Sequence, residues 1–204
     1  MNESSIESSI DPGTRGGDEL GGAIAAFDAW ADAGLEHIRG NPVADRVFSA
    51  ASTLGDFSLV WQLTGITRML GLGGDRRRQA VLLAGLVGAE SLLVNQGIKR
   101  LFRRTRPTDS GDERYEVRTP STSSFPSGHA SSAMFAATVL TSWSGRRTAP
   151  LWFGMGAIVA TSRAYVRIHH ASDVVGGAVV GLALGQLAVR SGLTRAGARG
   201  MRRR

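Results

Sequence analysis

Four blocks of apolar residues constrain the fold of this chain more than any other feature. Residues 80–98 carry a single ionisable side chain, Glu90, and they are about as long as the roughly 20 residues that cross a bilayer as a helix. Residues 130–143, 150–162 and 174–189 form three further blocks. No alternation of apolar and polar residues with a period of two indicates strands. The pattern predicts an all-α protein that buries these blocks in a membrane and against one another.

The N-terminal part of the chain is expected to form a different kind of helix. From residue 20 to residue 39 apolar residues recur at helical spacing, and Asp28, Asp32 and Glu36 share one face. This favours an amphipathic helix that lies at the membrane interface or packs on the protein, rather than a span. A further helical stretch is expected over residues 43–72, with its apolar half at the C-terminal end.

We therefore predict a multi-spanning transmembrane helix bundle of about five or six helices, with the amphipathic helix at its N-terminus. Five spans fit the blocks best, and six are the alternative. Gly177, Gly181 and Gly185 stand four positions apart in the last block. Glycines at this spacing let neighbouring helices approach closely.

One domain with two tails accounts for the 204 residues. Residues 1–19 are acidic and rich in Ser and Gly, without the apolar region of a signal peptide, so we expect a disordered tail. A single membrane domain is expected over residues 20–190 and a basic tail over residues 191–204. The chain has no cysteine, which excludes disulfides, thiolate metal sites and a catalytic cysteine.

The formal net charge of +7 does not indicate a nucleic-acid partner, because the cations fall in short runs between the apolar blocks. The runs at residues 76–78, 146–147 and 202–204 are expected to face the cytoplasm. The spans between them then place residues 99–127 on the extracytoplasmic side. The cations at residues 99–106 contradict the positive-inside rule there, and an anionic ligand would account for them.

The first candidate site pairs Lys99 with Arg106, seven positions apart on a segment that a proline ends. Two cations placed in this way can clamp phosphate oxygens. Lys99 is the only lysine of the chain, so a compact ammonium group is indicated there. The alternative is a juxtamembrane patch that contacts lipid headgroups, and Arg100, Arg103 and Arg104 fit that description.

The second candidate site is the turn Pro126-Ser127-Gly128-His129, which precedes an apolar helix. Backbone N–H groups at the start of a helix can bind an anion. Ser127 adds a hydroxyl group and His129 a titratable ring. The alternative is that Ser127 only caps the helix and that His129 is an exposed residue of its first turn.

The third candidate site consists of Arg163, His169 and Asp173. Because His169 and Asp173 are four positions apart, we expect them on one helical face, where the carboxylate holds one imidazole nitrogen. The other nitrogen would then be free to attack phosphorus, with Arg163 neutralising the phosphoryl oxygens. The alternative is a structural His–Asp pair, and His170 is the rival nucleophile.

The three sites together closely resemble the signature of the type 2 phosphatidic acid phosphatase superfamily. The matching segments are Lys99 to Arg106-Pro107, Pro126 to His129, and Ser162-Arg163 through His169 to Asp173. The resemblance implies one set of residues that binds phosphate and another that is catalytic. The phosphate-binding residues would be Lys99, Arg106, Ser127, Gly128 and Arg163. The second is His169 as nucleophile, Asp173 as the group that orients it, and His129 as the acid for the departing lipid oxygen.

The resemblance also implies an activity. It is that of a metal-independent lipid phosphatase in the cell membrane, which hydrolyses a phosphomonoester or diphosphate through a phosphohistidine intermediate. We expect no cofactor and no metal site, since no cluster of carboxylates indicates one. The expected partners are a lipid phosphate, of polyprenyl or phosphatidate type, and the surrounding membrane lipids. An extracytoplasmic site favours the polyprenyl carriers.

Three other functions are compatible with parts of this pattern. A phosphotransferase would use the same intermediate with an acceptor other than water. A non-catalytic protein that binds lipid phosphates would be expected to lack His129 or His169, and both are present. Vanadium-dependent haloperoxidases and soluble acid phosphatases resemble the same signature, but apolar blocks flank each motif here. No feature of the sequence indicates an oligomeric state.

Overall fold

The computed structural model of the chain describes residues 12–70, 74–107, 115 and 122–197. These residues form seven α-helices and no β-strand, which confirms the predicted all-α class. The helices are α1 (Pro12–Glu36), α2 (Pro42–Gly55), α3 (Leu59–Met69), α4 (Gly74–Leu92), α5 (Gly128–Ser144), α6 (Ala149–Tyr165) and α7 (Ala171–Arg190).

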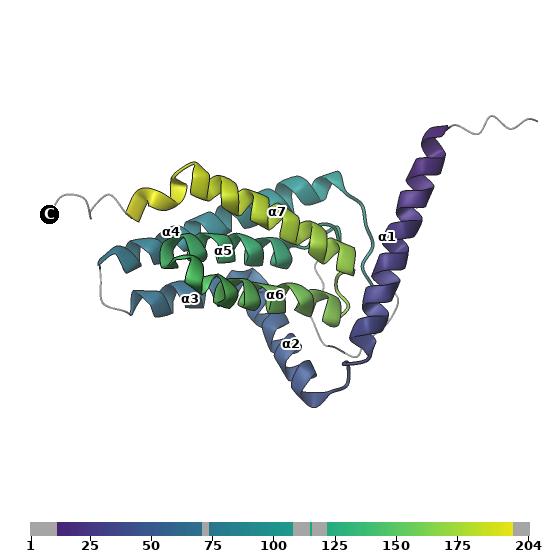
Figure 1. Cartoon of the computed structure of the whole chain (residues 1–204), viewed down its shortest axis with the longest axis horizontal. Helices are drawn as coiled ribbons and strands as arrows, with labels where there is room; N and C mark the ends of the chain where they lie inside the picture. The colour runs from purple at the N-terminus through teal and green to yellow at the C-terminus, as the bar shows by residue number, and fades with distance from the viewer. Residues whose placement is uncertain (1–11, 71–73, 108–114, 116–121, 198–204) are drawn as a thin grey trace, which may run out of the picture.

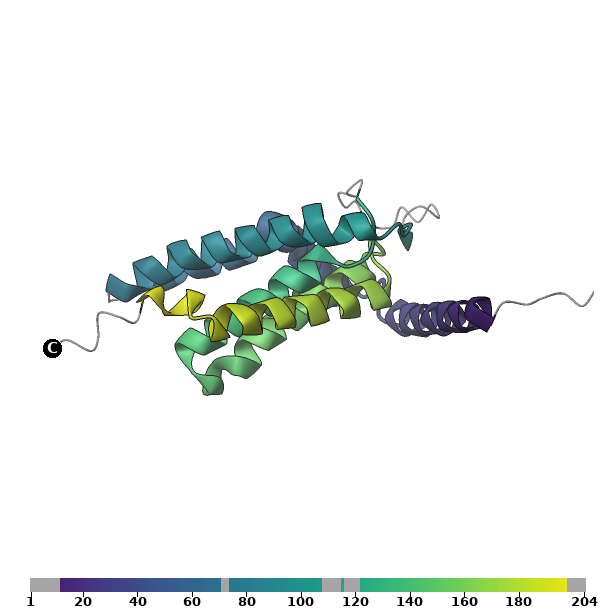
Figure 2. The ribbon, with the colours of Figure 1, turned by 90° about the horizontal axis from the view of Figure 1, so that it is seen from above.

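Helices α3 to α7 run side by side along the long axis of the molecule (Figures 1 and 2). α5 is central, since it packs against α4, α6 and α7. Its side chains Phe135, Val139 and Leu140 belong to an apolar core that also contains Trp61 of α3 and Leu83 of α4. This core holds α5, whose first residues belong to the second motif, against the helices around it.

Glycine allows α7 to lie directly on α5. A Cβ atom at Gly181 would overlap the backbone carbonyl group of Ser131, and one at Gly177 would overlap that of Ser127. One turn further along, a Cβ atom at Gly185 would lie 2.8 Å from the side chain of Thr138 of α5. The glycines that are spaced four apart in the sequence therefore form a close contact between α5 and α7. This contact sets the distance between the second and third motifs.

α4 does not stop where its regular α-helix ends. It continues as a π-helical turn, Leu93–Gly97, and then as a 3₁₀ turn, Ile98–Leu101. A π-helical turn shifts the register of the side chains that follow it, and such turns are frequent at functional sites. Lys99 lies in the 3₁₀ turn and is buried.

The single helical stretch predicted over residues 43–72 is two helices instead. α2 ends at Gly55, and α3 runs at an angle to it (Figure 1). Ser58, in the 3₁₀ turn between them, has a left-handed backbone with φ of 58°, which an α-helix cannot accommodate. Asp56, which the sequence placed within one helix, therefore lies at a bend. This division raises the number of helices above the predicted five or six.

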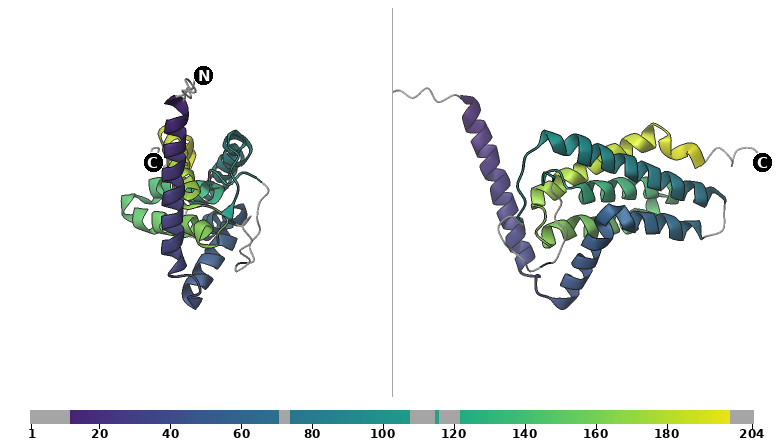
Figure 3. Two further views of the ribbon diagram at one scale, coloured as in Figure 1. Left: turned by 90° about the vertical axis from the view of Figure 1, so that its right-hand side faces the viewer. Right: turned by 180° about the vertical axis from the view of Figure 1, so that it is seen from behind.

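α1 crosses one end of the bundle at a steep angle to the other helices (Figure 3). It begins at Pro12, within the segment for which a tail was expected. Proline is well suited to the first turn of a helix because its φ is already helical and its missing N–H is not needed there. Residues 1–11 of that tail lie outside the described residues.

Two helical segments of the described chain are long and apolar enough to cross a membrane, Asp75–Leu101 and Ala171–Arg190. α5 and α6 have 17 residues each, somewhat short of the roughly 20 residues of a full crossing. The number of spans therefore stays a prediction. The start of α4, the α5–α6 connection and the end of α7 lie at one end of the bundle, opposite α1 (Figure 1).

Candidate active site

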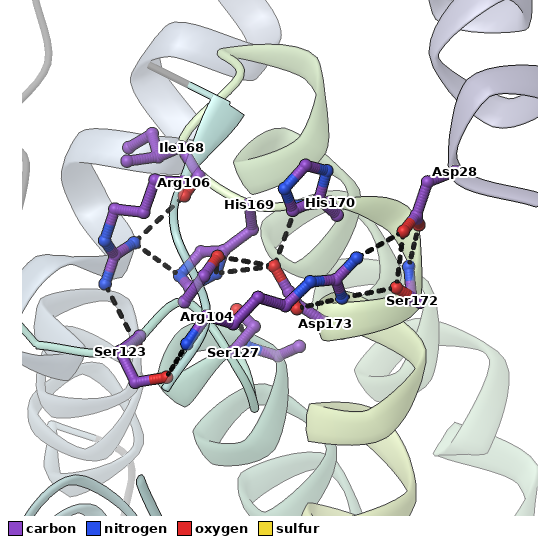
Figure 4. A network of polar contacts seen from close by, with 12 residues as sticks. Asp28, Arg104, Arg106, Ser123, Ser127, Ile168, His169, His170, Ser172 and Asp173 are labelled. Atoms are coloured by element: carbon purple, nitrogen blue, oxygen red, sulfur yellow. Dashed lines mark hydrogen bonds and ion pairs between the residues drawn. The ribbon is translucent and has the colours of Figure 1, made fainter. Parts of the chain in front are cut away.

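The motifs meet at the end of the bundle that α1 crosses. Arg106 follows the turns after α4, Ser127 directly precedes α5, and His169 lies in the connection between α6 and α7 (Figure 4). The backbone N–H of Ser127 donates to the carbonyl oxygen of Asp173 at 2.9 Å. This bond joins the second motif to the third.

His169 is 3% exposed, and its two ring nitrogens face different partners. Nε2 lies 3.2 Å from Nη1 of Arg106. Nδ1 lies 3.3 Å from Oγ of Ser124 and 3.6 Å from Oδ2 of Asp173 (Figure 4). Because a guanidinium group can only donate, we assign Nε2 as the acceptor and Nδ1 as the protonated nitrogen. The lone pair of the ring therefore faces a cation.

Burial holds the pKa of His169 far below its ordinary value. Desolvation lowers the pKa most, and the positive charges of Arg106, Lys99 and Arg163 lower it further, while Asp173 opposes the shift. The resulting pKa is about 3. The imidazole is consequently neutral at neutral pH, as a nucleophile must be.

His169 and Asp173 do not share a helical face, and that prediction was wrong, because α7 begins only at Ala171. His170 is the N-cap of α7. The Asp173 carboxylate accepts the backbone N–H of His170 at 2.9 Å, and the His170 ring accepts that of Asp173. This reciprocal capping places the carboxylate beside His169 from the helix end. His170 also lines the larger cavity beside His169, so it stays the alternative nucleophile.

Ser124 was not among the residues predicted from the sequence. Its hydroxyl group donates to Oδ2 of Asp173 at 2.5 Å and lies beside Nδ1 of His169. The side chain is fully buried. Its position shortly before the turn of the second motif is the signal that could have found it.

Arg106 and Arg163 are buried cations with different surroundings. Arg106 donates from Nη1 to the carbonyl oxygen of Ile168 at 2.9 Å and from Nη2 to that of Thr122 at 3.1 Å. Arg163 is 1% exposed, and its Nη1 donates to Oγ of Ser52 at 2.5 Å. Within the described part of the chain, Nε and Nη2 of Arg163 have no hydrogen-bond partner. Buried donors without a partner are unfavourable unless a ligand satisfies them.

His129 contacts a carboxylate that sequence reasoning missed. Its Nε2 lies 2.9 Å from Oδ1 of Asp56, and the same oxygen lies 3.6 Å from Nη1 of Arg163. A Cβ atom at Gly55 would come within 2.5 Å of the His129 ring, so the end of α2 is shaped to receive that ring. No local pattern pairs residues 56 and 129, and only the bend between α2 and α3 brings them together.

Ser127 and Gly128 have the local geometry that the sequence indicated. Ser127 is the N-cap of α5, and its Oγ accepts the N–H of Ala130 at 3.5 Å. A Cβ atom at Gly128 would lie 2.8 Å from Oδ1 of Asn95, so this position has no space for a side chain. The capping role and the exposed first-turn N–H groups of a helix start are therefore compatible here.

Two cavities meet at His169. The first, of about 350 Å³, is lined by residues far apart in the sequence, among them Asp56, Lys99, Gly128, His129 and His169. The second, of about 470 Å³, lies between α1 and the segment that carries Arg106. Ser127, Arg163 and Asp173 line neither of these two cavities. In the described residues no group of three His, Cys, Asp or Glu side chains could hold a metal ion.

Comparison with known proteins decides the family. The family model of the PAP2 superfamily matches residues 79–196, more than half of the chain and all three motifs. The protein belongs to the PAP2 superfamily. This PAP2 membership confirms the resemblance seen in the sequence and makes the chain a member of a family of membrane phosphatases.

Two relatives with the same description are similar to this PAP2 protein in sequence. Decaprenylphosphoryl-5-phosphoribose phosphatase of Mycobacterium tuberculosis is 35% identical over 137 residues, which are 67% of this chain and 73% of that protein. The Mycolicibacterium smegmatis protein is 35% identical over 128 residues, 63% of this chain and 68% of its own length.

Two solved PAP2 structures share the fold. The transmembrane PAP2 type phosphatidylglycerolphosphate phosphatase of Bacillus subtilis has a TM-score of 0.61 at 23% identity and covers 89% of each chain. Aquifex aeolicus LpxE has a TM-score of 0.57 at 24% identity, over 74% of this chain and 88% of the other. At these identities the likeness shows the helical fold alone.

Proposed function

We propose that this protein hydrolyses a phosphate ester of a membrane lipid through a phosphohistidine formed on His169, without a metal ion. The surroundings of His169 carry the proposal. A buried, neutral imidazole has its accepting nitrogen 3.2 Å from a guanidinium nitrogen of Arg106. That is the arrangement in which a phosphoryl group could be held by cations and attacked by nitrogen.

Three buried cations support an anionic ligand. Lys99, Arg106 and Arg163 are each less than a tenth exposed, and Lys99 is close enough to both arginines to be repelled by them. Burying like charges together is unfavourable unless a counter-charge accompanies them. A phosphoryl group would supply that charge and acceptors for the two unpaired nitrogens of Arg163.

In the first chemical step, Nε2 of His169 forms a bond to phosphorus while the bond from phosphorus to the lipid oxygen breaks. His129 lines the cavity next to His169 and would give its proton to the departing oxygen, so that the lipid leaves as an alcohol. Asp56, 2.9 Å from His129, would favour the protonated ring before the transfer.

In the second step, water attacks the phosphohistidine. His129, now neutral, takes a proton from the water as its oxygen bonds to phosphorus, and the bond between Nε2 and phosphorus breaks. Inorganic phosphate leaves, and both histidines return to their starting protonation states. The buried cations would stabilise the charge on the phosphoryl oxygens in both steps.

The substrate class follows from the relatives. We infer a polyprenyl-linked phosphate, and specifically the terminal phosphomonoester of a polyprenylphosphoryl sugar, because the mycobacterial relatives are phosphatases of decaprenylphosphoryl-5-phosphoribose. We also infer several membrane crossings with the site on the extracytoplasmic side. The bundle end opposite α1 supports this orientation, because the arginines at residues 76–78 and 146–147 lie there.

The test uses the full chain, purified in detergent with EDTA present. Phosphate release is measured from decaprenylphosphoryl-5-phosphoribose, a polyprenyl phosphate, a polyprenyl diphosphate and phosphatidate. We expect the parent to be active and His169→Ala to lose at least about a thousandfold in kcat, because the nucleophile is removed. Acid-labile phosphate on the parent protein, absent in His169→Ala, would identify the intermediate.

Three outcomes would contradict the proposal. Activity that disappears with EDTA excludes the metal-independent mechanism, and activity that survives in His169→Ala excludes the nucleophile. A higher kcat/KM for phosphatidate than for the polyprenyl compounds excludes the inferred substrate class and leaves the mechanism intact.

A further inference from the structure

Asp28 of α1 is connected to the nucleophile through two other charged residues. Oδ2 of Asp28 lies 2.5 Å from Nη2 of Arg104, and Nη1 of Arg104 lies 2.6 Å from Oδ1 of Asp173 (Figure 4). The other oxygen of Asp173 faces Nδ1 of His169 at 3.6 Å. Negative and positive charges therefore alternate from α1 to the imidazole.

These contacts hold the Asp173 carboxylate at both oxygens. Oδ1 accepts from Arg104, and Oδ2 accepts from the hydroxyl group of Ser124 and the backbone N–H of His170. The side chain of Asp173 has no exposed surface. A buried carboxylate with bonds on both sides keeps one orientation toward His169.

Arg104 is in turn held by Asp28, which is 8% exposed. The Asp28 carboxylate accepts the backbone N–H of Ser172 at 2.7 Å and its hydroxyl group at 2.8 Å, and Arg104 donates to the same hydroxyl at 2.7 Å. The interpretation of Arg104 as a cation for lipid headgroups was therefore wrong, because its guanidinium binds two carboxylates and a serine of the protein.

The charge of Asp28 decides how strongly Arg104 acts on Asp173. With Asp28 in place, the guanidinium is shared between two carboxylates. Without that charge it would act on Asp173 alone, draw the carboxylate toward itself and weaken the support for positive charge on the His169 ring. The ring gains such charge when it bonds to phosphorus, so the effect would fall on the chemical step.

We propose that Asp28 is a positioning residue for the phosphatase reaction, acting through Arg104 on Asp173 and His169. α1 is then a part of the active site and not only a helix at its edge. This inference rests on the proposed function, because it assigns Asp28 an effect on the rate of phosphoryl transfer.

Asp28 could also act only by docking α1 on the bundle. Glu36 is the control for that role, because it lies on the same face of α1 about two turns further along. Oε2 of Glu36 accepts from Arg39 at 2.8 Å and from Arg167 at 2.9 Å. Glu36→Gln removes one charge, a local ion pair with Arg39, and the ion pair with Arg167 that joins α1 to the segment after α6. The described contacts of Glu36 do not reach Asp173.

The experiment compares Asp28→Asn with Glu36→Gln in the purified full chain, on the lipid phosphate that the parent hydrolyses fastest. Asparagine keeps an acceptor for the Ser172 N–H, so the first variant removes mainly charge. We expect Asp28→Asn to lower kcat about tenfold with KM changed less than about twofold, and Glu36→Gln to keep kcat within about twofold. Thermal unfolding of both variants shows whether either has lost structure.

A double-mutant cycle provides a second measurement. The residual rate of Asp173→Asn is measured in single turnovers at high enzyme concentration. Adding Asp28→Asn to this variant should lower the rate no further, because Asp28 acts on His169 only through Asp173. The inference is overturned if Asp28→Asn is no slower than Glu36→Gln, or if its effect is equally large without Asp173. A parent without activity on any lipid phosphate overturns the proposed function, and this inference with it.

Discussion

His169 and His129 each lie next to a carboxylate, but the two pairs differ in origin and in surroundings. Asp173 is four residues from His169 and meets it at the start of α7. Asp56 is 73 residues from His129 and meets it at the bend between α2 and α3. His169 is almost fully buried, whereas the His129 side chain is 17% exposed. His169 therefore suits a neutral nucleophile, whereas the charge of Asp56 favours the protonated His129 ring that an acid needs.

The pH dependence of activity tests the first of these roles. Because the pKa of His169 is lowered to about 3, the neutral ring persists as the pH falls and is lost only near that value. Burial lowers the pKa of the free His129 ring to about 4, and a bound phosphate anion would raise that pKa, so the acid is protonated mainly in the substrate complex. We expect kcat to have no acidic limb above about pH 5 and to decline with rising pH as His129 of that complex loses its proton. The profile is measured from pH 4 to pH 10, with each sample returned to neutral pH to check for irreversible loss. An acidic limb centred near the ordinary histidine pKa of 6.5 would contradict this expectation.

Asp56 is expected to support the acid. Replacing it with asparagine removes the charge 2.9 Å from His129, so we expect kcat to fall about tenfold and the alkaline limb to move to lower pH. Asp45→Asn, in α2 shortly before the bend that carries Asp56, is the control, since the described contacts of the Asp45 carboxylate include the hydroxyl groups of Tyr115 and Tyr165. Equal pH profiles for Asp56→Asn and the parent would show that Asp56 does not tune the acid.

At the scale of elements, the contact between α5 and α7 sets the geometry of the site. A Cβ atom at Gly181 would overlap a backbone carbonyl group of α5, which cannot move like a side chain. We expect Gly181→Ala to destabilise the protein by about 1–3 kcal/mol, in the range of overpacked cores. The unfolding midpoint in detergent measures this change.

Gly88→Ala is the matched control for that substitution, because a Cβ atom at Gly88 of α4 meets nothing within 4 Å. Alanine there should leave the midpoint unchanged or raise it, since alanine favours helix more than glycine by about 1 kcal/mol. If both variants unfold at the same temperature as the parent, the α5–α7 contact is looser than the structure indicates.

At the scale of the whole molecule, orientation in the membrane decides which compartment the site faces. The absence of cysteine allows a direct test. Thr122→Cys lies at the site, and Arg146→Cys lies in the α5–α6 connection at the other end of the bundle. We expect a membrane-impermeant maleimide to label Thr122→Cys in intact cells and Arg146→Cys only after permeabilisation. The reverse pattern would place the site in the cytoplasm.

Much of this protein could be predicted from the sequence because the relevant patterns are local. The apolar blocks predict α5, α6 and α7, and the glycine spacing predicts the close contact of α7. The motifs that contain Lys99, His129 and His169 led to the family, because each motif is a short run of residues with a fixed spacing. Local order along the chain was enough for all of these conclusions.

Tertiary structure decided what depends on residues far apart in the sequence. The bend at Ser58 brings Asp56 to His129, and the position of α1 brings Asp28 to Arg104, across 73 and 76 residues respectively. The low pKa of His169 likewise comes from burial among charges contributed by separate helices. Spacing along the chain specifies which groups are available, whereas packing specifies their neighbours and therefore their charge, because electrostatic interactions depend on distance and solvation.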